Sequence, residues 1–174
     1  NDVYAEGSLV NDGGASSVEI AGNTQVNGDV QLLGWSSSIL GTVRTQGNVT
    51  LGNTSSILDG LYSDGQIELT GSDGRIEGEV VNSGDVLLNA SNTMISGVLR
   101  TDAELISLNA WQAKVLGDLY VSSEDIIYQK PWQNTQVGTV HEGQAPDKAP
   151  EEPYVYSAPD LVLDAPIEWN IQDF

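Results

Sequence analysis

Cysteine is absent from this 174-residue chain, and positively charged side chains are scarce. Without cysteine the protein has no disulfides, no thiolate metal ligands and no cysteine nucleophile. The chain has 6 Lys and Arg against 25 Asp and Glu, a formal net charge of −19. This charge argues against nucleic acid as a partner, because phosphate binding needs clustered cations. No apolar run approaches the ~20 residues of a transmembrane helix, so we expect no membrane insertion.

Residues suited to catalysis are also few. The single histidine, His141, lies in a Pro-rich stretch, where we expect an exposed loop side chain. One imidazole cannot build a three-histidine zinc site. Arg44 and Arg100 occupy matching repeat positions about three coils apart, which is too far for one site. We therefore expect no enzyme, no catalytic residue and no cofactor. A carbohydrate-active enzyme is the less favoured alternative, since among 25 acids some pair reaches glycosidase spacing by accident.

A repeat of 18 to 20 residues dominates what is present. It has a first phase of the form G-x-Φ-x-Φ, where Φ is apolar. The triplets of this phase are Val30–Leu32, Val49–Leu51, Ile67–Leu69, Val86–Leu88 and Ile106–Leu108. Glycine precedes the first four by two residues, and in the fifth copy Ala103 takes its place with one residue inserted. Seven residues after each closing Leu a second phase follows, Φ-x-G-x-Φ, as in Ile39 to Val43. Alternation with period two is typical of strands, and the Asn, Asp, Ser and Gly between the phases are typical of turns.

Short strands with glycine at fixed places in both phases of the repeat favour stacked coils over an antiparallel sandwich or barrel. The fold class predicted is all-β: a single-stranded parallel β-solenoid, or β-helix, of about seven coils of about 19 residues. Val49, Leu51, Ile67, Leu69, Val86 and Leu88 are predicted to point inward as columns. Three divisions follow from composition: a solenoid over 1–140, a Pro-rich acidic linker over 141–153, and an extended apolar C-terminal segment over 154–174 that we expect to pack on the solenoid.

The glycine-punctuated rungs, such as Ile39 to Leu51 and Ile76 to Val80, resemble the bactofilins. These are polymer-forming bacterial proteins built from a short parallel β-helix, and the resemblance extends to bactofilin-like solenoids of secreted or pilus-assembly-associated proteins. It covers about residues 18–128. The resemblance implies a structural or assembly role and brings no catalytic residues. The long Ser/Asn/Thr corners and the C-terminal extension depart from the bactofilin pattern and favour an extracytoplasmic location.

Two sets of corner residues are candidate binding sites. The repeat places Trp35 and Trp111 at one corner, four coils or about 19 Å apart. There they are suited to stack on sugar rings or to contact a protein. Alternatively, the C-terminal segment covers them, or each folds against its own corner. The alignment places Thr54, Ser72 and Ser91 at the same corner position. Asp12, Asp64 and Asp73 lie in Gly-containing turns and are candidate Ca²⁺ ligands, although the same sequences are typical of solvated turns.

These observations predict a non-enzymatic structural or adhesive module of a bacterial cell-surface or secreted assembly, pilus-associated assemblies included. Its partner would be a protein or a glycan. The alternative is a self-polymerising scaffold of the bactofilin type in the cytoplasm, in which self-association occurs through the terminal coils. The chain begins at Asn1 without a methionine, so we expect a processed protein or an excised domain.

Overall fold

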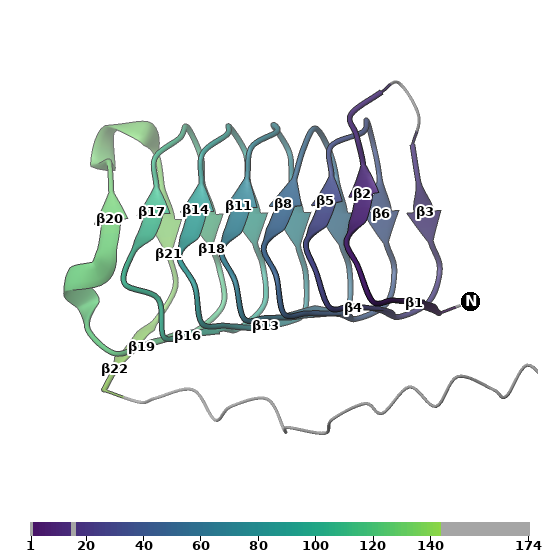
Figure 1. Ribbon diagram of the computed structural model, residues 1–174. Helices are drawn as coiled ribbons and strands as arrows, with labels where there is room; N and C mark the ends of the chain where they lie inside the picture. The colour runs from purple at the N-terminus through teal and green to yellow at the C-terminus, as the bar shows by residue number, and fades with distance from the viewer. Residues whose placement is uncertain (1, 15–16, 144–174) are drawn as a thin grey trace, which may run out of the picture.

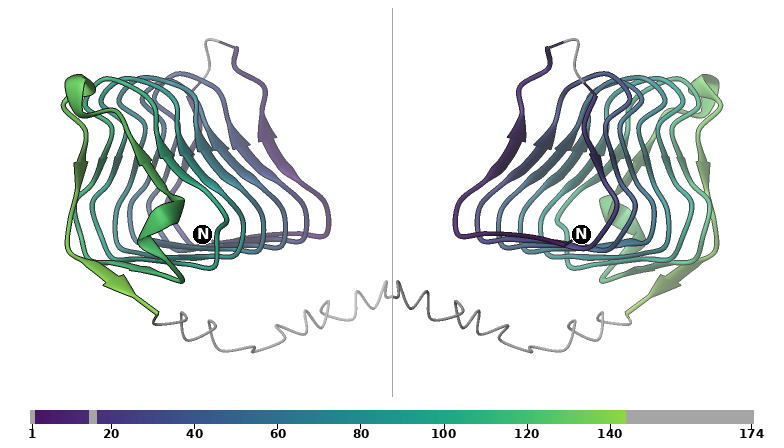
Figure 2. Two further views of the ribbon diagram at one scale, coloured as in Figure 1. Left: turned by 90° about the vertical axis from the view of Figure 1, so that its left-hand side faces the viewer. Right: turned by 90° about the vertical axis from the view of Figure 1, so that its right-hand side faces the viewer.

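The computed structural model describes residues 2–14 and 17–143, which form a parallel β-solenoid (Figure 1). The predicted fold class is thereby confirmed. Strands of successive coils stack into three parallel sheets of eight, seven and seven strands, here called sheets A, B and C. Each coil supplies one strand to each sheet in that order, so the chain makes about seven turns. Viewed along the solenoid axis, the cross-section is triangular, with one sheet on each side (Figure 2).

All strands are two to four residues long, because the chain turns a corner after each of them. Sheet A contains β1 (Val3–Ala5), β4 (Thr24–Val26), β7 (Val43–Thr45), β10 (Gly60–Ser63), β13 (Glu79–Asn82), β16 (Leu99–Thr101), β19 (Leu119–Val121) and β22 (Val140–Glu142). Sheet B contains β2 (Leu9–Asn11), β5 (Val30–Leu32), β8 (Val49–Leu51), β11 (Ile67–Leu69), β14 (Val86–Leu88), β17 (Ile106–Leu108) and β20 (Ile127–Gln129). Sheet C contains β3 (Glu19–Ile20), β6 (Ser38–Ile39), β9 (Ser56–Ile57), β12 (Arg75–Ile76), β15 (Met94–Ile95), β18 (Lys114–Val115) and β21 (Gln136–Val137). Two 3₁₀ helices, η1 (Glu124–Ile126) and η2 (Pro131–Gln133), interrupt the last coil.

The inward side chains form apolar columns that run the length of the stack. In sheet B, Leu69 pairs in register with Leu51 in the coil before and Leu88 in the coil after. The six residues predicted to point inward, Val49, Leu51, Ile67, Leu69, Val86 and Leu88, are all 0 % exposed, which confirms that prediction. Sheet C contributes a column of isoleucines that are fully buried at Ile39, Ile57, Ile76 and Ile95.

Glycines stack where the corner backbones of successive coils come closest. A Cβ at Gly65 would lie 2.5 Å from the carbonyl oxygen of Gly47 in the preceding coil. Real Cβ atoms do not approach backbone so closely, so only glycine fits this column. Gly7 lies outside these close approaches, since a Cβ there would have nothing within 4 Å. The fixed glycines of the repeat are therefore set by the contact between coils.

A second column, at the inner side of the corner between sheets A and B, is polar and buried. Its central members are Thr45, Ser63, Asn82 and Thr101. The Ser63 hydroxyl donates to the Gly47 carbonyl at 3.0 Å, and Thr101 Oγ1 accepts from the Ala103 amide at 3.0 Å. These side chains hydrogen-bond corner backbone that the sheet ladders leave unpaired. This column was not predicted from the sequence. Its members stand two residues before the first-phase glycine of each repeat, or before Ala103 in the fifth copy.

On the outside of the same corner, side-chain oxygens link one coil to the next. Asp29 accepts from the Asn48 amide at 2.8 Å, and Asn48 accepts from the Gln66 amide at 2.9 Å. The next such bond runs from the Leu105 amide to Asp85 at 3.0 Å. The Asp and Asn residues at this corner therefore bond backbone between coils as well as contributing negative charge.

The two ends of the stack differ. At the N-terminal end, β1, β2 and β3 are the outermost strands of their sheets, and each pairs only with the following coil. At the C-terminal end, η1 is part of the last coil, and its half-buried Ile126 packs against the core. β22 includes His141 and Glu142, so the solenoid extends past the predicted start of the linker. The rest of the linker from 144 onward and the apolar segment 154–174 lie outside the described residues.

Candidate functional site

The corner between sheets B and C, called here the BC edge, carries the two tryptophans singled out from the sequence. Trp35 lies between β5 and β6, and Trp111 lies between β17 and β18. Their side chains are 61 % and 52 % exposed. The two corners are four coils apart, which is about 19 Å at the usual strand spacing. Both residues lie at the same corner, as the alignment predicted, and neither indole is covered by the described residues. The alternative that the C-terminal segment 154–174 covers them concerns residues outside the described part of the chain.

A third tryptophan lies on the same edge. Trp132 belongs to η2, between β20 and β21, and is 71 % exposed. The Lys130 ammonium lies 5.8 Å from the centre of its ring. The sequence analysis missed Trp132 because η2 inserts into the last coil and removes the repeat spacing there. Trp132 could still have been found from the sequence, because it follows a proline at the place where the repeat predicts a BC corner.

The backbone of the BC edge repeats in a left-handed conformation. Six non-glycine residues there have φ between 52° and 62°, one in each successive corner: Ser36, Thr54, Asp73, Asn92, Gln112 and Asn134. Short polar side chains tolerate this conformation better than apolar ones, which explains the Ser, Thr, Asp and Asn composition. Thr54 thus corresponds to Ser36 and Asp73. The predicted alignment of Thr54 with Trp35, Ser72 and Ser91 was wrong, because the corner at residues 52–55 is one residue shorter.

Hydrogen bonds continue along the BC edge from coil to coil. The amides of the first five left-handed residues each donate to a carbonyl of the next coil: Ser36 to Asn53 at 3.2 Å, Thr54 to Ser72 at 2.9 Å, Asp73 to Ser91 at 3.0 Å, Asn92 to Trp111 at 2.9 Å and Gln112 to Gln133 at 2.8 Å. Beneath them the buried Ser55 hydroxyl donates to the Gly34 carbonyl at 3.1 Å. Buried Thr93 likewise donates to the Ala90 carbonyl at 2.8 Å. Backbone bonds on the outside and hydroxyl bonds on the inside therefore both stabilise the edge. The tryptophans are attached to a backbone that is hydrogen-bonded from coil to coil.

The three aspartates considered for calcium do not lie together. Asp12 and Asp73 are on the BC edge, in the first and fourth coils, about 14 Å apart along the axis. Asp64 is at the corner between sheets A and B. Within residues 2–14 and 17–143, no group of three or more His, Cys, Asp and Glu side chains is arranged to hold a metal ion. Calcium binding at any one of these turns stays a prediction.

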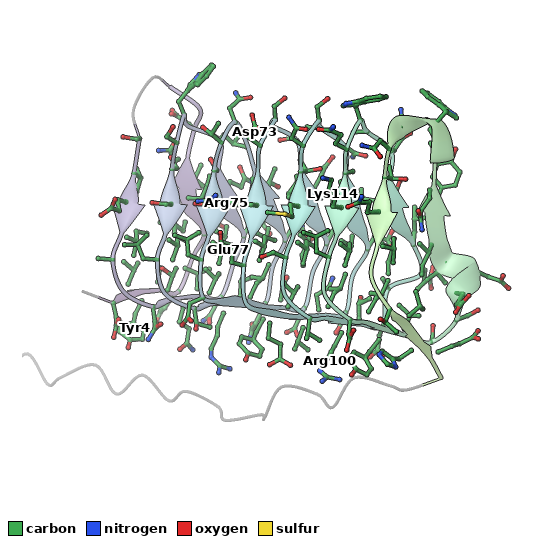
Figure 3. All side chains as sticks on the ribbon, turned by 180° about the vertical axis from the view of Figure 1, so that it is seen from behind. Tyr4, Asp73, Arg75, Glu77, Arg100 and Lys114 are labelled. Carbon is green, nitrogen blue, oxygen red and sulfur yellow. The ribbon has the colours of Figure 1, made fainter. Side chains whose placement is uncertain are left out.

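The outer face of sheet A carries a stack of aromatic and cationic side chains. Its central row reads Tyr4, Gln25, Arg44, Tyr62, Val81, Arg100, Tyr120 and His141. The Arg44 guanidinium lies 4.5 Å from the Tyr62 ring centre, and the Arg100 guanidinium lies 4.1 Å from that of Tyr120. Arg100 also pairs with Glu79 at 3.0 Å. Figure 3 shows Tyr4 and Arg100 on this face, opposite the edge that carries Asp73.

His141 ends this stack. It lies in β22, so the prediction of a loop histidine was wrong. Its ring stacks on Tyr120 with centres 4.5 Å apart and planes 12° apart, and its Nε2 lies 3.5 Å from an Asp118 carboxylate oxygen. These contacts join the last strand of sheet A to the coil before it.

The stacking decides which aromatic faces are open to a partner. A guanidinium occupies one face of Tyr62 and one face of Tyr120, and the other face of Tyr120 meets His141. Burial, and next the charge of Glu79, raise the pKa of the Tyr62 phenol. Tyr62 and Tyr120 are thus engaged within the solenoid, whereas Trp35, Trp111 and Trp132 keep more than half of their surface in solvent.

No family model, no curated protein and no solved structure matches this chain. Among the described residues, none of the helices has the length and apolar character needed to cross a membrane.

Proposed function

We propose that this protein is a non-enzymatic structural or adhesive module of a bacterial cell-surface or secreted assembly, and that it presents the BC edge to a partner. One observation carries the proposal: three large apolar side chains stand exposed on one hydrogen-bonded edge. Burying so much apolar surface against a partner is favourable, and a rigid edge loses little entropy in doing so.

The residues best suited to chemistry support the non-enzymatic assignment by their contacts. Arg100 binds Glu79 and Tyr120, and His141 stacks on Tyr120 beside Asp118. Arg44 lies on Tyr62 three coils from Arg100. Each of these side chains therefore contributes to the contact between coils. The bactofilin resemblance agrees with a structural role.

Cosedimentation with isolated bacterial envelopes tests the proposal. The wild-type protein should sediment with envelope material, and the Trp35→Ala/Trp111→Ala double variant should remain in the supernatant. Tyr4→Ala is the matched control, because it removes an aromatic side chain that is 44 % exposed on sheet A. If wild type does not sediment, or if the double variant sediments equally well, the proposal is wrong.

A self-polymerising scaffold is the second candidate. It is supported by the N-terminal end, where β1, β2 and β3 each have a strand neighbour on one side only. Unpaired strand edges invite pairing with another chain. Electron microscopy and sedimentation velocity of the purified protein distinguish the two: filaments would favour the scaffold, and a single small species would favour the presenting module.

A further inference from the structure

We propose that the BC edge binds an uncharged polysaccharide chain lying parallel to the solenoid axis, with the tryptophans as stacking platforms. This inference rests on the proposed function and names the partner of the same edge. Three features support it: the distribution of charge over the three corners, the spacing of the indoles, and the polar groups between them.

Negative charge avoids the BC edge. The corner between sheets A and B holds eight acids and no Lys or Arg: Glu6, Asp29, Asp64, Asp85, Asp102, Glu104, Glu124 and Asp125. The corner between sheets C and A, which includes the chain just before β1, holds four: Asp2, Asp59, Glu77 and Asp118. The described BC edge holds Asp12 and Asp73 against Lys130. On a chain of net charge −19, one edge is therefore close to neutral.

This distribution selects against charged ligands. A polyanion would find no cluster of cations on the described BC edge, where Lys130 stands against Asp12 and Asp73, and the twelve carboxylates of the other two corners oppose its approach at low ionic strength. A polycation would be attracted to those acidic corners rather than to the tryptophans. An uncharged chain experiences neither effect, so contact with the indoles decides where it binds.

Between the tryptophans the edge displays hydroxyl and amide groups. From Asn53 to Asn92 its exposed side chains are Asn53, Thr54, Thr70, Ser72, Asp73, Asn89, Ser91 and Asn92. Such groups both donate and accept hydrogen bonds, as sugar hydroxyls do. Figure 3 shows Asp73 at the crest of this edge, pointing away from the solenoid. A sugar ring has apolar C–H faces and a polar rim, which suits an indole below and amides or hydroxyls beside it.

The spacing sets the length of ligand. Trp35 and Trp111 are about 19 Å apart along the axis, and Trp132 lies one coil beyond Trp111. An extended chain of several sugar units is needed to reach from Trp35 to Trp111, whereas a disaccharide is too short to contact both of them. Affinity should therefore rise steeply with chain length, because binding at the second platform becomes intramolecular.

Native affinity electrophoresis tests the inference with hydroxyethylcellulose, galactomannan and laminarin as uncharged probes. Carboxymethylcellulose is the charged counterpart of the first, with the same backbone. Wild type should be retarded by at least one uncharged polymer and not by carboxymethylcellulose. Trp35→Ala and Trp111→Ala should each weaken binding at least tenfold, and Tyr4→Ala should not. Unchanged urea midpoints for the variants exclude misfolding. With a responsive polymer, its long oligosaccharides should bind at least tenfold more tightly than its disaccharide.

Three results would overturn the inference: no retardation by any uncharged polymer, stronger binding to carboxymethylcellulose, or equal binding by the tryptophan variants. If any of these occurs while envelope cosedimentation still depends on Trp35 and Trp111, the edge binds a protein, and the proposed function stands without its glycan ligand. If cosedimentation fails as well, the presenting role itself is wrong.

Discussion

Replacing Leu69 by alanine tests the stacked core directly. Leu69 is 0 % exposed and lies in register between Leu51 and Leu88, which are also fully buried. The change removes three carbons, worth about 2.4 kcal/mol at about 0.8 kcal/mol each. The cavity adds to this cost, because leucines of two hydrogen-bonded coils cannot collapse into it. We expect the free energy of unfolding to fall by about 2–5 kcal/mol.

Urea denaturation followed by circular dichroism measures this loss. With a slope of about 2 kcal/mol per M, the midpoint should fall by about 1–2.5 M. Thr50→Ala is the control, since Thr50 lies in the neighbouring coil of the same sheet but at its outward position. Its effect should stay within about 0.5 kcal/mol. If Leu69→Ala were no more destabilising than Thr50→Ala, the inward register of sheet B would be refuted.

Three further substitutions test other features of the stack. Gly65→Ala should cost about 1–3 kcal/mol in thermal or urea unfolding because its Cβ meets backbone, whereas Gly7→Ala should be neutral or slightly stabilising. Thr101→Val should cost about 1–3 kcal/mol by leaving a buried amide without its acceptor, a loss visible in urea melts and in faster amide exchange. Because the Tyr62 pKa is raised in the fold, the unfolded phenol ionises first. Wild-type stability should therefore fall as the pH rises past ~10, and more steeply than that of Tyr62→Phe in parallel urea melts.

The fold could be predicted because the sequence repeat shows directly which residues form strands and where successive coils touch. Val49 and Leu51 alternate with a polar residue, as strands do, and the recurring glycines mark backbone contact between coils. Equivalent residues of successive coils then stack into the inward columns, since each coil must bury the same face. No long-range inference beyond the period was required.

Other features were out of reach for identifiable reasons. Ser63 and Thr101 have the composition of a solvated corner, and only the structure shows that they turn inward to bond the backbone. Thr54 was misaligned because one corner is a residue shorter, which a count from the closing leucine cannot reveal. His141 was assigned to a linker because Pro and acids follow it, although strand pairing extends through it.

The ends of the solenoid bear on how it would assemble. Sheet A has one strand more than sheets B and C, so the C-terminal end is stepped at β22. If a second copy placed its β1 on this β22, one strand position would stay empty between its β2 and β20 of the first copy. The same gap would separate its β3 from β21. Glu124 and Asp125 of η1 also lie at this end, where they would approach the acids of another strongly negative chain. The described strands thus offer no flush surface for head-to-tail stacking. Among the described residues the BC edge has neither this step nor this density of negative charge, which supports the proposed lateral presentation over end-to-end growth.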